Sequence, residues 1–143
     1  MSHASRRGSS SGVPRLVELP IRVVAAAALA VDAYVHADLA PTYDLNSASI
    51  SQGDLFRIEA ALAALAALLV LFFRNRLVRA YAFLVAAGGL AAVLVYRYID
   101  LGAFGPFPDM YEPLWFAEKT ASFVAEAVAT GATAVLLALP RRR

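Results

Sequence analysis

The sequence predicts an all-α protein, an integral membrane bundle of four transmembrane helices with both termini in the cytoplasm. Three observations lead to this prediction. Hydrophobic residues make up 60% of the chain and charged residues 17%, whereas soluble domains average about 45–50% and 25%. Four apolar runs reach the length of about 20 residues that a helix needs to cross a bilayer. The arginines gather at one end of these runs.

The chain divides into a polar tail, four spans and a short basic end. Residues 1–20 are rich in serine, glycine and arginine without helical spacing, which predicts a disordered cytoplasmic tail. Residues 140–143 form a basic cytoplasmic end. Between them, residues 21–139 form the transmembrane domain, with spans at 21–40, 55–73, 80–99 and 114–139.

Each apolar run is expected to be helical. Backbone N–H and C=O groups in lipid have to be hydrogen-bonded within their own segment, and the sequence shows no strand-length alternation typical of a barrel. Ser51 or Asp54 is placed to cap the second helix. Pro113 suits the first turn of the fourth helix.

The arginines set the expected orientation. If four spans alternate, only Arg57, Arg97 and Lys119 lie towards the side opposite the other basic residues. By the positive-inside rule, the termini are cytoplasmic and the protein is a multi-pass protein of the plasma membrane. The net charge of +2 is then a topology signal, and no nucleic-acid partner is expected.

An alternative remains open for the first span. The run "SRRGSSSGVPR", then "VVAAAALAV" and "VHA", resembles a signal peptide with a small-residue cleavage site. Against cleavage, Asp32 comes just after the short apolar stretch. Cleavage would also leave three spans, with the two ends of the chain on opposite sides.

Ionisable side chains inside the spans are the candidate functional residues, because a charge at mid-depth costs at least about 2.5–3.5 kcal/mol and needs a partner or water. Asp32 and His36 lie one turn apart on one face of the first span. Glu59 lies about one turn inside the second span, and Glu126 lies deep in the fourth. If these faces converge, Asp32, His36, Glu59 and Glu126 form a ligand or proton site in a pocket open to the outside.

Further polar residues flank this pocket. Arg57, Arg97 and Lys119 are expected to be counter-ions to the acids. Glu118 is expected to be a further charge partner, and it continues the stripe of Ser122 and Glu126. Tyr96 and Asp100 share a face at the outer end of span three. In the alternative interpretation, His36 and Glu118 lie near the interface and are simply solvated, and a buried carboxyl is simply protonated and hydrogen-bonded.

A divalent metal such as iron, manganese or zinc is one candidate ligand, held by His36, Glu59 and Glu126. No paired Glu-x-x-His motif, nucleotide-binding glycine loop, Gly-x-Ser-x-Gly elbow or HExxH motif is present. The chain also contains no cysteine, which excludes thiolate sites. An ATPase or a common type of hydrolase is therefore not expected, and the catalytic residues stay unassigned.

Four stretches of the sequence look familiar together: "HADLAPTYD", "ISQGDLFRIEA", "YRYIDLGAFGPFPDMYEP" and "LWFAEKT". In this combination the chain resembles a group of small, alanine-rich, four-span membrane proteins of high-GC actinobacteria. The resemblance covers about residues 32–126. It implies the four-span architecture and no particular activity.

Three functions are consistent with the sequence. The leading hypothesis is a non-enzymatic membrane protein whose outward-facing polar pocket binds a cation, a proton or a small polar ligand. The second is a membrane-embedded redox or metal-dependent enzyme that uses His36 with the glutamates. The third is an accessory or assembly subunit of a membrane complex. The lipid bilayer is an expected partner. Small residues spaced four apart could also form the contact face of a homo-oligomer or of a complex with another membrane protein.

Overall fold

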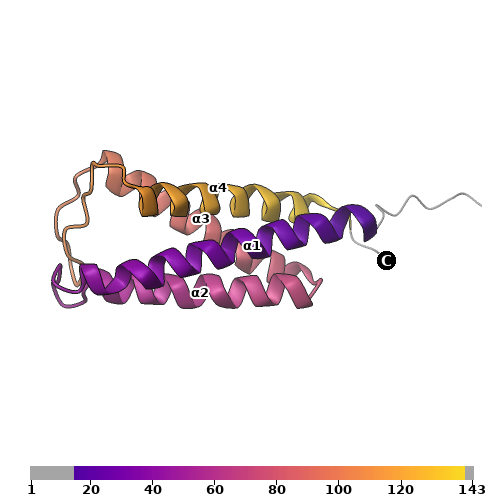
Figure 1. The fold of residues 1–143 in the computed structure, drawn as a ribbon, viewed down its shortest axis with the longest axis horizontal. Coiled ribbons are helices and arrows are strands. Elements are labelled where there is room, and N and C mark those ends of the chain that lie inside the picture. The colour runs from indigo at the N-terminus through magenta and orange to yellow at the C-terminus, as the bar shows by residue number, and fades with distance from the viewer. Residues whose placement is uncertain (1–14, 141–143) are drawn as a thin grey trace, which may run out of the picture.

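The structure, a computed structural model, describes residues 15–140 and places four long helices side by side (Figure 1). The first helix packs against the second and the fourth, and the third against the fourth and the second. The all-α prediction is therefore confirmed. A short 3-10 helix, η1, follows the first long helix. The elements in chain order are α1 (Arg15–Leu39), η1 (Ala40–Tyr43), α2 (Gln52–Phe72), α3 (Arg76–Tyr98) and α4 (Ala117–Ala138).

The two ends of the helices differ in character. One end, the loop end, carries η1 and the connecting segments 44–51 and 99–116 (Figure 1). The other, the arginine end, carries the start of α1, the short turn 73–75 and the end of α4 (Figure 1). Residues far apart in sequence therefore meet at each end, which is what assembles the sites described below.

Three of the four helices are long and apolar enough to cross a membrane, namely α2, α3 and α4. This finding supports the prediction of a membrane protein with transmembrane helices. The first helix is not among the three, and it carries Glu18, Arg22, Asp32 and His36, all of them buried. Large apolar side chains meanwhile cover the outer surface, with Leu68 57% and Leu84 67% exposed.

The core between the helices is built mainly from alanine. Ala66 and Ala82 are fully buried, and Leu29, Val70 and Leu136 fill the space beside them. Small side chains let helix backbones approach closely and make many van der Waals contacts. Such contacts hold helices together in lipid, where the hydrophobic effect does not drive their association. This packed apolar layer lies between the loop end and the arginine end.

The first helix begins at Arg15 instead of residue 21, so residues 15–20 of the predicted disordered tail are helical. Pro20 lies inside it and removes only one backbone hydrogen bond. Tertiary contacts hold these first turns in place. Glu18 pairs with Arg74 and Arg79, each at 2.6 Å, and Arg22 donates to the Val70 carbonyl at 3.0 Å. The remainder of the predicted tail and the end at 141–143 lie outside the described residues.

Two predictions about helix starts had different outcomes. The prediction for α2 is confirmed, since Ser51 is its N-cap and accepts a hydrogen bond from the Asp54 N–H at 2.9 Å. The prediction that Pro113 opens the fourth helix is wrong, because α4 begins at Ala117. The preceding residues stay non-helical because Lys119 donates to the carbonyls of Glu112 and Leu114.

Candidate functional site

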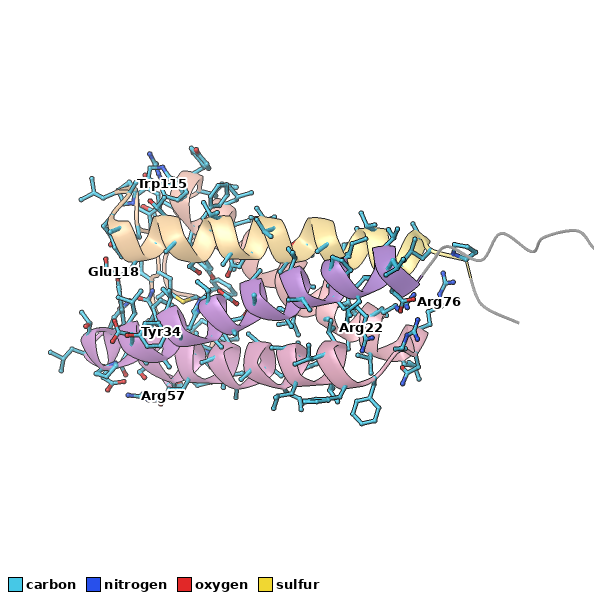
Figure 2. The ribbon with its side chains drawn as sticks, turned by 45° about the vertical axis from the view of Figure 1, so that its right-hand side comes forward. Arg22, Tyr34, Arg57, Arg76, Trp115 and Glu118 are labelled. Atoms are coloured by element: carbon cyan, nitrogen blue, oxygen red, sulfur yellow. The ribbon has the colours of Figure 1, made fainter. Side chains whose placement is uncertain are left out.

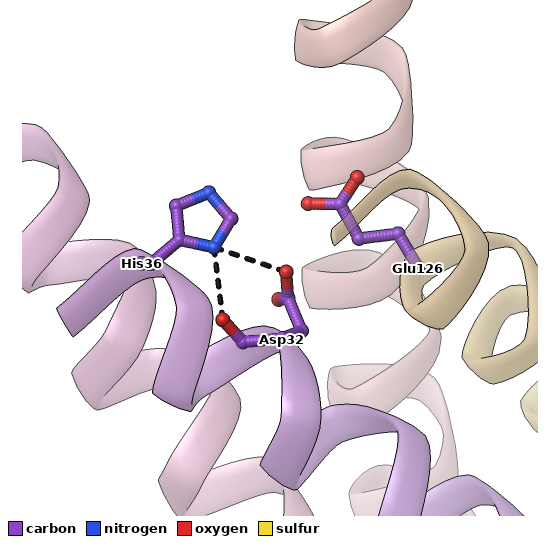
Figure 3. A group of neighbouring side chains, drawn as sticks. All are labelled: Asp32, His36 and Glu126. Carbon is purple, nitrogen blue, oxygen red and sulfur yellow. Dashed lines mark hydrogen bonds and ion pairs between the residues drawn. The ribbon is translucent and has the colours of Figure 1, made fainter. Parts of the chain in front are cut away.

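Asp32 and His36 form the centre of the candidate site, one turn apart on α1. His36 Nδ1 lies 3.0 Å from Asp32 Oδ1 and 3.0 Å from the Asp32 carbonyl oxygen (Figure 3). Asp32 therefore holds the Nδ1 side of the imidazole ring and orients the ring. Phe56 packs edge-on against the ring, with the centroids 5.2 Å apart.

The fourth helix supplies the opposite side of this site. Ser122 Oγ lies 3.0 Å from Asp32 Oδ1 and 3.4 Å from Glu126 Oε1, so it bridges α1 and α4. Glu126 points towards His36 and Asp32 (Figure 3). We refer to Asp32, His36, Ser122 and Glu126 as the buried cluster. All four residues are buried, and Asp32 and Glu126 have no exposed surface.

Several acceptor atoms of this region have no hydrogen-bond partner in the part of the chain that the structure describes. They are Asp32 Oδ2, Glu126 Oε2 and, from the neighbouring α2, Glu59 Oε1. Buried polar atoms in proteins are nearly always satisfied, and an unpartnered one costs about 1–3 kcal/mol. A proton, a cation or a donor group at this position would satisfy these oxygens.

Gly89 of α3 makes room for two of these carboxyl groups. A Cβ atom at this position would lie 2.5 Å from Glu126 Oε1 and 3.0 Å from Glu59 Oε1. Both carboxyl groups therefore reach the same point on α3 from two different helices. The structure thus brings together all four residues of the predicted site, Asp32, His36, Glu59 and Glu126.

A cavity of about 350 Å³ lies between this cluster and the loop end. His36, Glu59 and Ser122 line it, so it reaches the buried cluster from the loop side. Its remaining wall is mostly apolar and aromatic. The aromatic lining residues are Tyr43, Phe56, Tyr96, Phe104, Phe107 and Phe116.

The two connecting segments of the loop end are joined above the cavity. The Ile50 N–H donates to the Pro106 carbonyl at 3.0 Å, and Asn46 Nδ2 donates to the Asp109 carbonyl at 2.8 Å. Asn46 Nδ2 also donates to Gln52 Oε1 at 2.6 Å, and Gln52 lines the cavity. This network fixes the segments at the cavity's edge.

The sequence predicted Arg57 as a charge partner of the acids. It does pair with carboxylates, but with those of Asp44 and Asp54 instead of the buried cluster. It is exposed on α2 (Figure 2) and forms a bidentate pair with Asp44, with distances of 2.7 and 2.8 Å. Asp54 adds a third contact at 3.1 Å. The hydrogen bond from Arg57 lowers the pKa of Asp44. Arg57 lies on the solvent side of α2, whereas Glu59, two residues on, faces inward.

Arg97 and Lys119 also bind groups other than the acids that were predicted. The Arg97 guanidinium lies over the rings of Tyr98 and Trp115, 4.9 and 5.7 Å from their centroids. Lys119 Nζ lies 5.3 Å from the Trp115 centroid and donates to loop carbonyls. Aromatic faces therefore stabilise both cations at the loop end, and carbonyl groups stabilise Lys119 in addition. The spacing of residues in the sequence does not reveal these partners.

The remaining predicted residues separate into lining and surface positions. Glu118 is exposed at the loop end of α4 (Figure 2), so the predicted stripe includes Ser122 and Glu126 only. Tyr96 lines the cavity. Asp100 does not share its helical face, because α3 ends at Tyr98, and it accepts a hydrogen bond from the Gly102 N–H at 3.1 Å.

The structure changes the predicted metal ligands. Asp32, His36 and Glu126 are the described residues whose ligand atoms all lie within 4.8 Å of one another. Asp32 thus takes the place that the sequence gave to Glu59. Asp32 contacts His36 through Oδ1, and its second oxygen, Oδ2, has no partner among the described residues.

Sequence reasoning missed Gly89 as part of the site. A signal was present, because two adjacent glycines, Gly88 and Gly89, interrupt a helix that is otherwise rich in alanine, leucine and valine. Glycine inside a helix costs about 1 kcal/mol relative to alanine, which points to a packing or functional reason. Gly88 has no atom within 4 Å of an added Cβ, so the close approach belongs to Gly89 alone.

Comparison of the chain with protein-family models, with curated proteins and with solved structures finds no match.

Proposed function

We propose that this chain is a four-span protein of the plasma membrane, with both termini in the cytoplasm, that binds a cation in an outward-facing pocket. The pocket is the cavity at the loop end together with the buried cluster and Glu59. Three helices with the length and apolarity of membrane spans support the membrane setting. The role of α1 as the fourth span and the orientation belong to the proposal.

The burial of α1 supports its role as the fourth span. It packs against both α2 and α4. Arg22, Asp32 and His36 are buried against the other helices, whereas Asp38, near the loop end of α1, is exposed. The outward-facing side chains of α1 include Val23, Val24 and Val31, which are 47–48% exposed. A helix with buried charges and an apolar outer face is suited to lipid.

The observation that carries the cation proposal is the set of unpartnered carboxylate oxygens at full burial. Asp32 Oδ2 and Glu126 Oε2 have no partner, and both residues have 0% exposed surface. Neither Arg97 nor Lys119 reaches these oxygens, because each is held by aromatic faces at the loop end. A bound cation would satisfy the oxygens and offset their mutual repulsion.

The packing between the buried cluster and the arginine end favours a site that binds a cation over a channel that conducts one. Leu29, Val70 and Leu136, each at most 1% exposed, fill the core between the buried cluster and the arginine end. Among the described residues, this layer consists of apolar side chains and Tyr81, whose hydroxyl group donates to the Leu62 carbonyl at 2.9 Å. The cavity is therefore a pocket with a single opening, through which a ligand both enters and leaves.

Topology can be tested by single cysteines, because the chain contains none. Ser49→Cys and Ala103→Cys lie at exposed positions of the loop end, and Ser9→Cys lies in the tail. In intact cells, a membrane-impermeant maleimide should label the first two and should label Ser9→Cys only after lysis. Labelling of all three from outside would contradict the four-span arrangement.

Cation binding can be tested on the protein in lipid nanodiscs. The probes are sodium, magnesium, manganese, zinc and tetramethylammonium chlorides, and the readout is the thermal unfolding midpoint. At least one cation should raise the midpoint of the wild type, because binding to the folded state alone stabilises it. Glu126→Gln should lose this rise, whereas Glu118→Gln, which changes an exposed carboxylate on the same helix, should keep it. A panel without any effect on the wild type would contradict the proposed function.

A further inference from the structure

We infer that the cation is a divalent transition metal ion, of the class of manganese, iron or zinc, coordinated by Asp32, His36 and Glu126. This inference rests on the proposed function and names the ligand of the same site. Particular side-chain atoms are assigned to coordination. The buried cluster holds the ion, and the cavity gives access to it.

The donor set selects the class of metal. One imidazole and two carboxylates form the group whose ligand atoms lie within 4.8 Å of one another. Imidazole suits zinc and iron, whereas magnesium and calcium prefer sites built entirely from oxygen. The chain has no cysteine, so soft thiolate coordination plays no part. A mixed nitrogen and oxygen site of this kind therefore favours a borderline transition metal.

The geometry is close to what coordination requires. Ligand atoms about 2.1 Å from a zinc ion lie at most about 4.2 Å apart. The observed limit is 4.8 Å. His36 coordinates the same ion as Asp32 through Nδ1, which lies 3.0 Å from Asp32 Oδ1, and the metal then takes the place of the Nδ1 proton. Asp32 and His36 are fixed to each other by their position one turn apart on α1, so Glu126 is the ligand that adjusts.

The unpartnered oxygens provide an independent observation. Asp32 Oδ1 is engaged by His36 and Ser122 at 3.0 Å each, which leaves Oδ2 as its free ligand atom. Glu126 likewise has Oε1 near Ser122 and Oε2 without a partner. Ser122 thus orients both carboxylates by bonds to the oxygens that are not needed for the metal. Hydrogen bonds of this kind from neighbouring residues position the ligands of metal sites.

The cavity supplies the open coordination position. Three protein ligands with a fourth position left for water or another molecule are typical of reactive zinc sites, whereas structural sites have four protein ligands. His36 and Ser122 line the cavity, as does Glu59, whose Oε1 lies near the same point on Gly89 as Glu126 Oε1. Glu59 is therefore placed to accept a hydrogen bond from a molecule bound at the open position.

The test is a titration of the detergent-purified protein, stripped of metal with a chelator, against manganese and zinc chlorides. Bound metal is measured by elemental analysis and by the paramagnetic resonance of Mn²⁺. The wild type should bind one ion per chain. His36→Ala and Glu126→Gln should each weaken binding by about 100-fold, and Glu118→Gln should bind as the wild type does. The far-ultraviolet circular dichroism of each variant shows whether its helices are intact.

The outcomes separate this inference from the proposed function. If tetramethylammonium or sodium stabilises the wild type through Glu126 while manganese and zinc do not bind, the metal assignment is overturned and the cation pocket stands. If manganese binds the wild type, His36→Ala and Glu126→Gln equally, the ion lies elsewhere and the assignment is overturned. If the wild type is neither stabilised by any cation of the panel nor binds manganese or zinc, both the proposed function and the metal assignment fail. Should a variant lose its helices, Ser122→Ala replaces it, with a smaller expected loss of affinity.

Discussion

Gly89 on α3 lies directly against the carboxyl group of Glu126 on α4, so close that a Cβ atom at position 89 would be 2.5 Å from Glu126 Oε1. The same Cβ would be 3.0 Å from Glu59 Oε1. One glycine therefore allows two buried carboxyl groups from two helices to meet at the wall of a third. Its backbone is helical, so the reason for glycine is space rather than conformation.

Gly89→Ala is expected to weaken cation binding by about tenfold or more, which corresponds to ~1.4 kcal/mol. The added methyl group would displace the Glu126 carboxyl group from its place beside Ser122. Gly88→Ala is the matched control, because nothing lies within 4 Å of an added Cβ there. It should keep the affinity while stabilising the helix by up to about 1 kcal/mol. Titration of both variants with the same cation distinguishes them, and an equal affinity in the two would contradict the role given to Gly89.

Ser122→Ala is expected to lower cation affinity by roughly tenfold with little loss of helical structure. The hydroxyl group of Ser122 bonds to Asp32 Oδ1 and Glu126 Oε1, so its removal frees both carboxylates to turn. Thr130→Ala is a suitable control. Its hydroxyl group donates to the Glu126 carbonyl of its own helix at 2.7 Å and touches no cluster side chain. If both variants lose affinity alike, Ser122 does not act by orienting the carboxylates.

Glu18→Gln is expected to destabilise the folded protein by about 1–2 kcal/mol. Glu18 accepts from Arg74 at 2.6 and 3.1 Å and from Arg79 at 2.6 Å, and it joins α1 to the start of α3. A glutamine has one acceptor oxygen instead of two and carries no negative charge, so it loses the bond from Arg74 Nη2 to Oε2 and weakens the others. Arg57→Gln, which breaks the exposed pair with Asp44, should lower the thermal midpoint less. Cation affinity should be unchanged in Glu18→Gln, because the arginine end lies across the apolar core from the cluster.

Glu18 is also expected to make the stability of the folded protein depend on pH in the acid range. Glu18 precedes residue 21 and lies outside the expected membrane segment. The hydrogen bond from Arg74 lowers its pKa from the ordinary value of 4.5. Its stabilising contribution is therefore complete above about pH 4.5, the unfolded value, and is lost as the pH falls through the lower folded value. The thermal midpoint of the wild type should fall on acidification below about pH 4.5. Glu18→Gln should show a smaller fall, and identical profiles would contradict this assignment.

The sequence by itself determined the helical class and the inward residues of α1. The length of the apolar runs predicted all four helices near their observed positions, because helix length and hydropathy are local properties. Asp32 and His36 were paired from their spacing alone, since residues four apart share a helical face. Residue type and position likewise limited the cap of α2 to Ser51 or Asp54, and the structure shows Ser51.

Only the tertiary structure decided which polar residues meet. Asp32 and Ser122 are 90 positions apart in sequence, and their hydrogen bond depends on the rotation of α1 against α4. A rotation of one residue would bring a different side chain to that contact, and no local signal sets it. The predicted partners of Arg97 were also wrong. The guanidinium lies over Trp115, which comes from a segment without regular structure, so helical spacing could not indicate the contact. Local composition thus determines the helices, whereas packing between them determines the site.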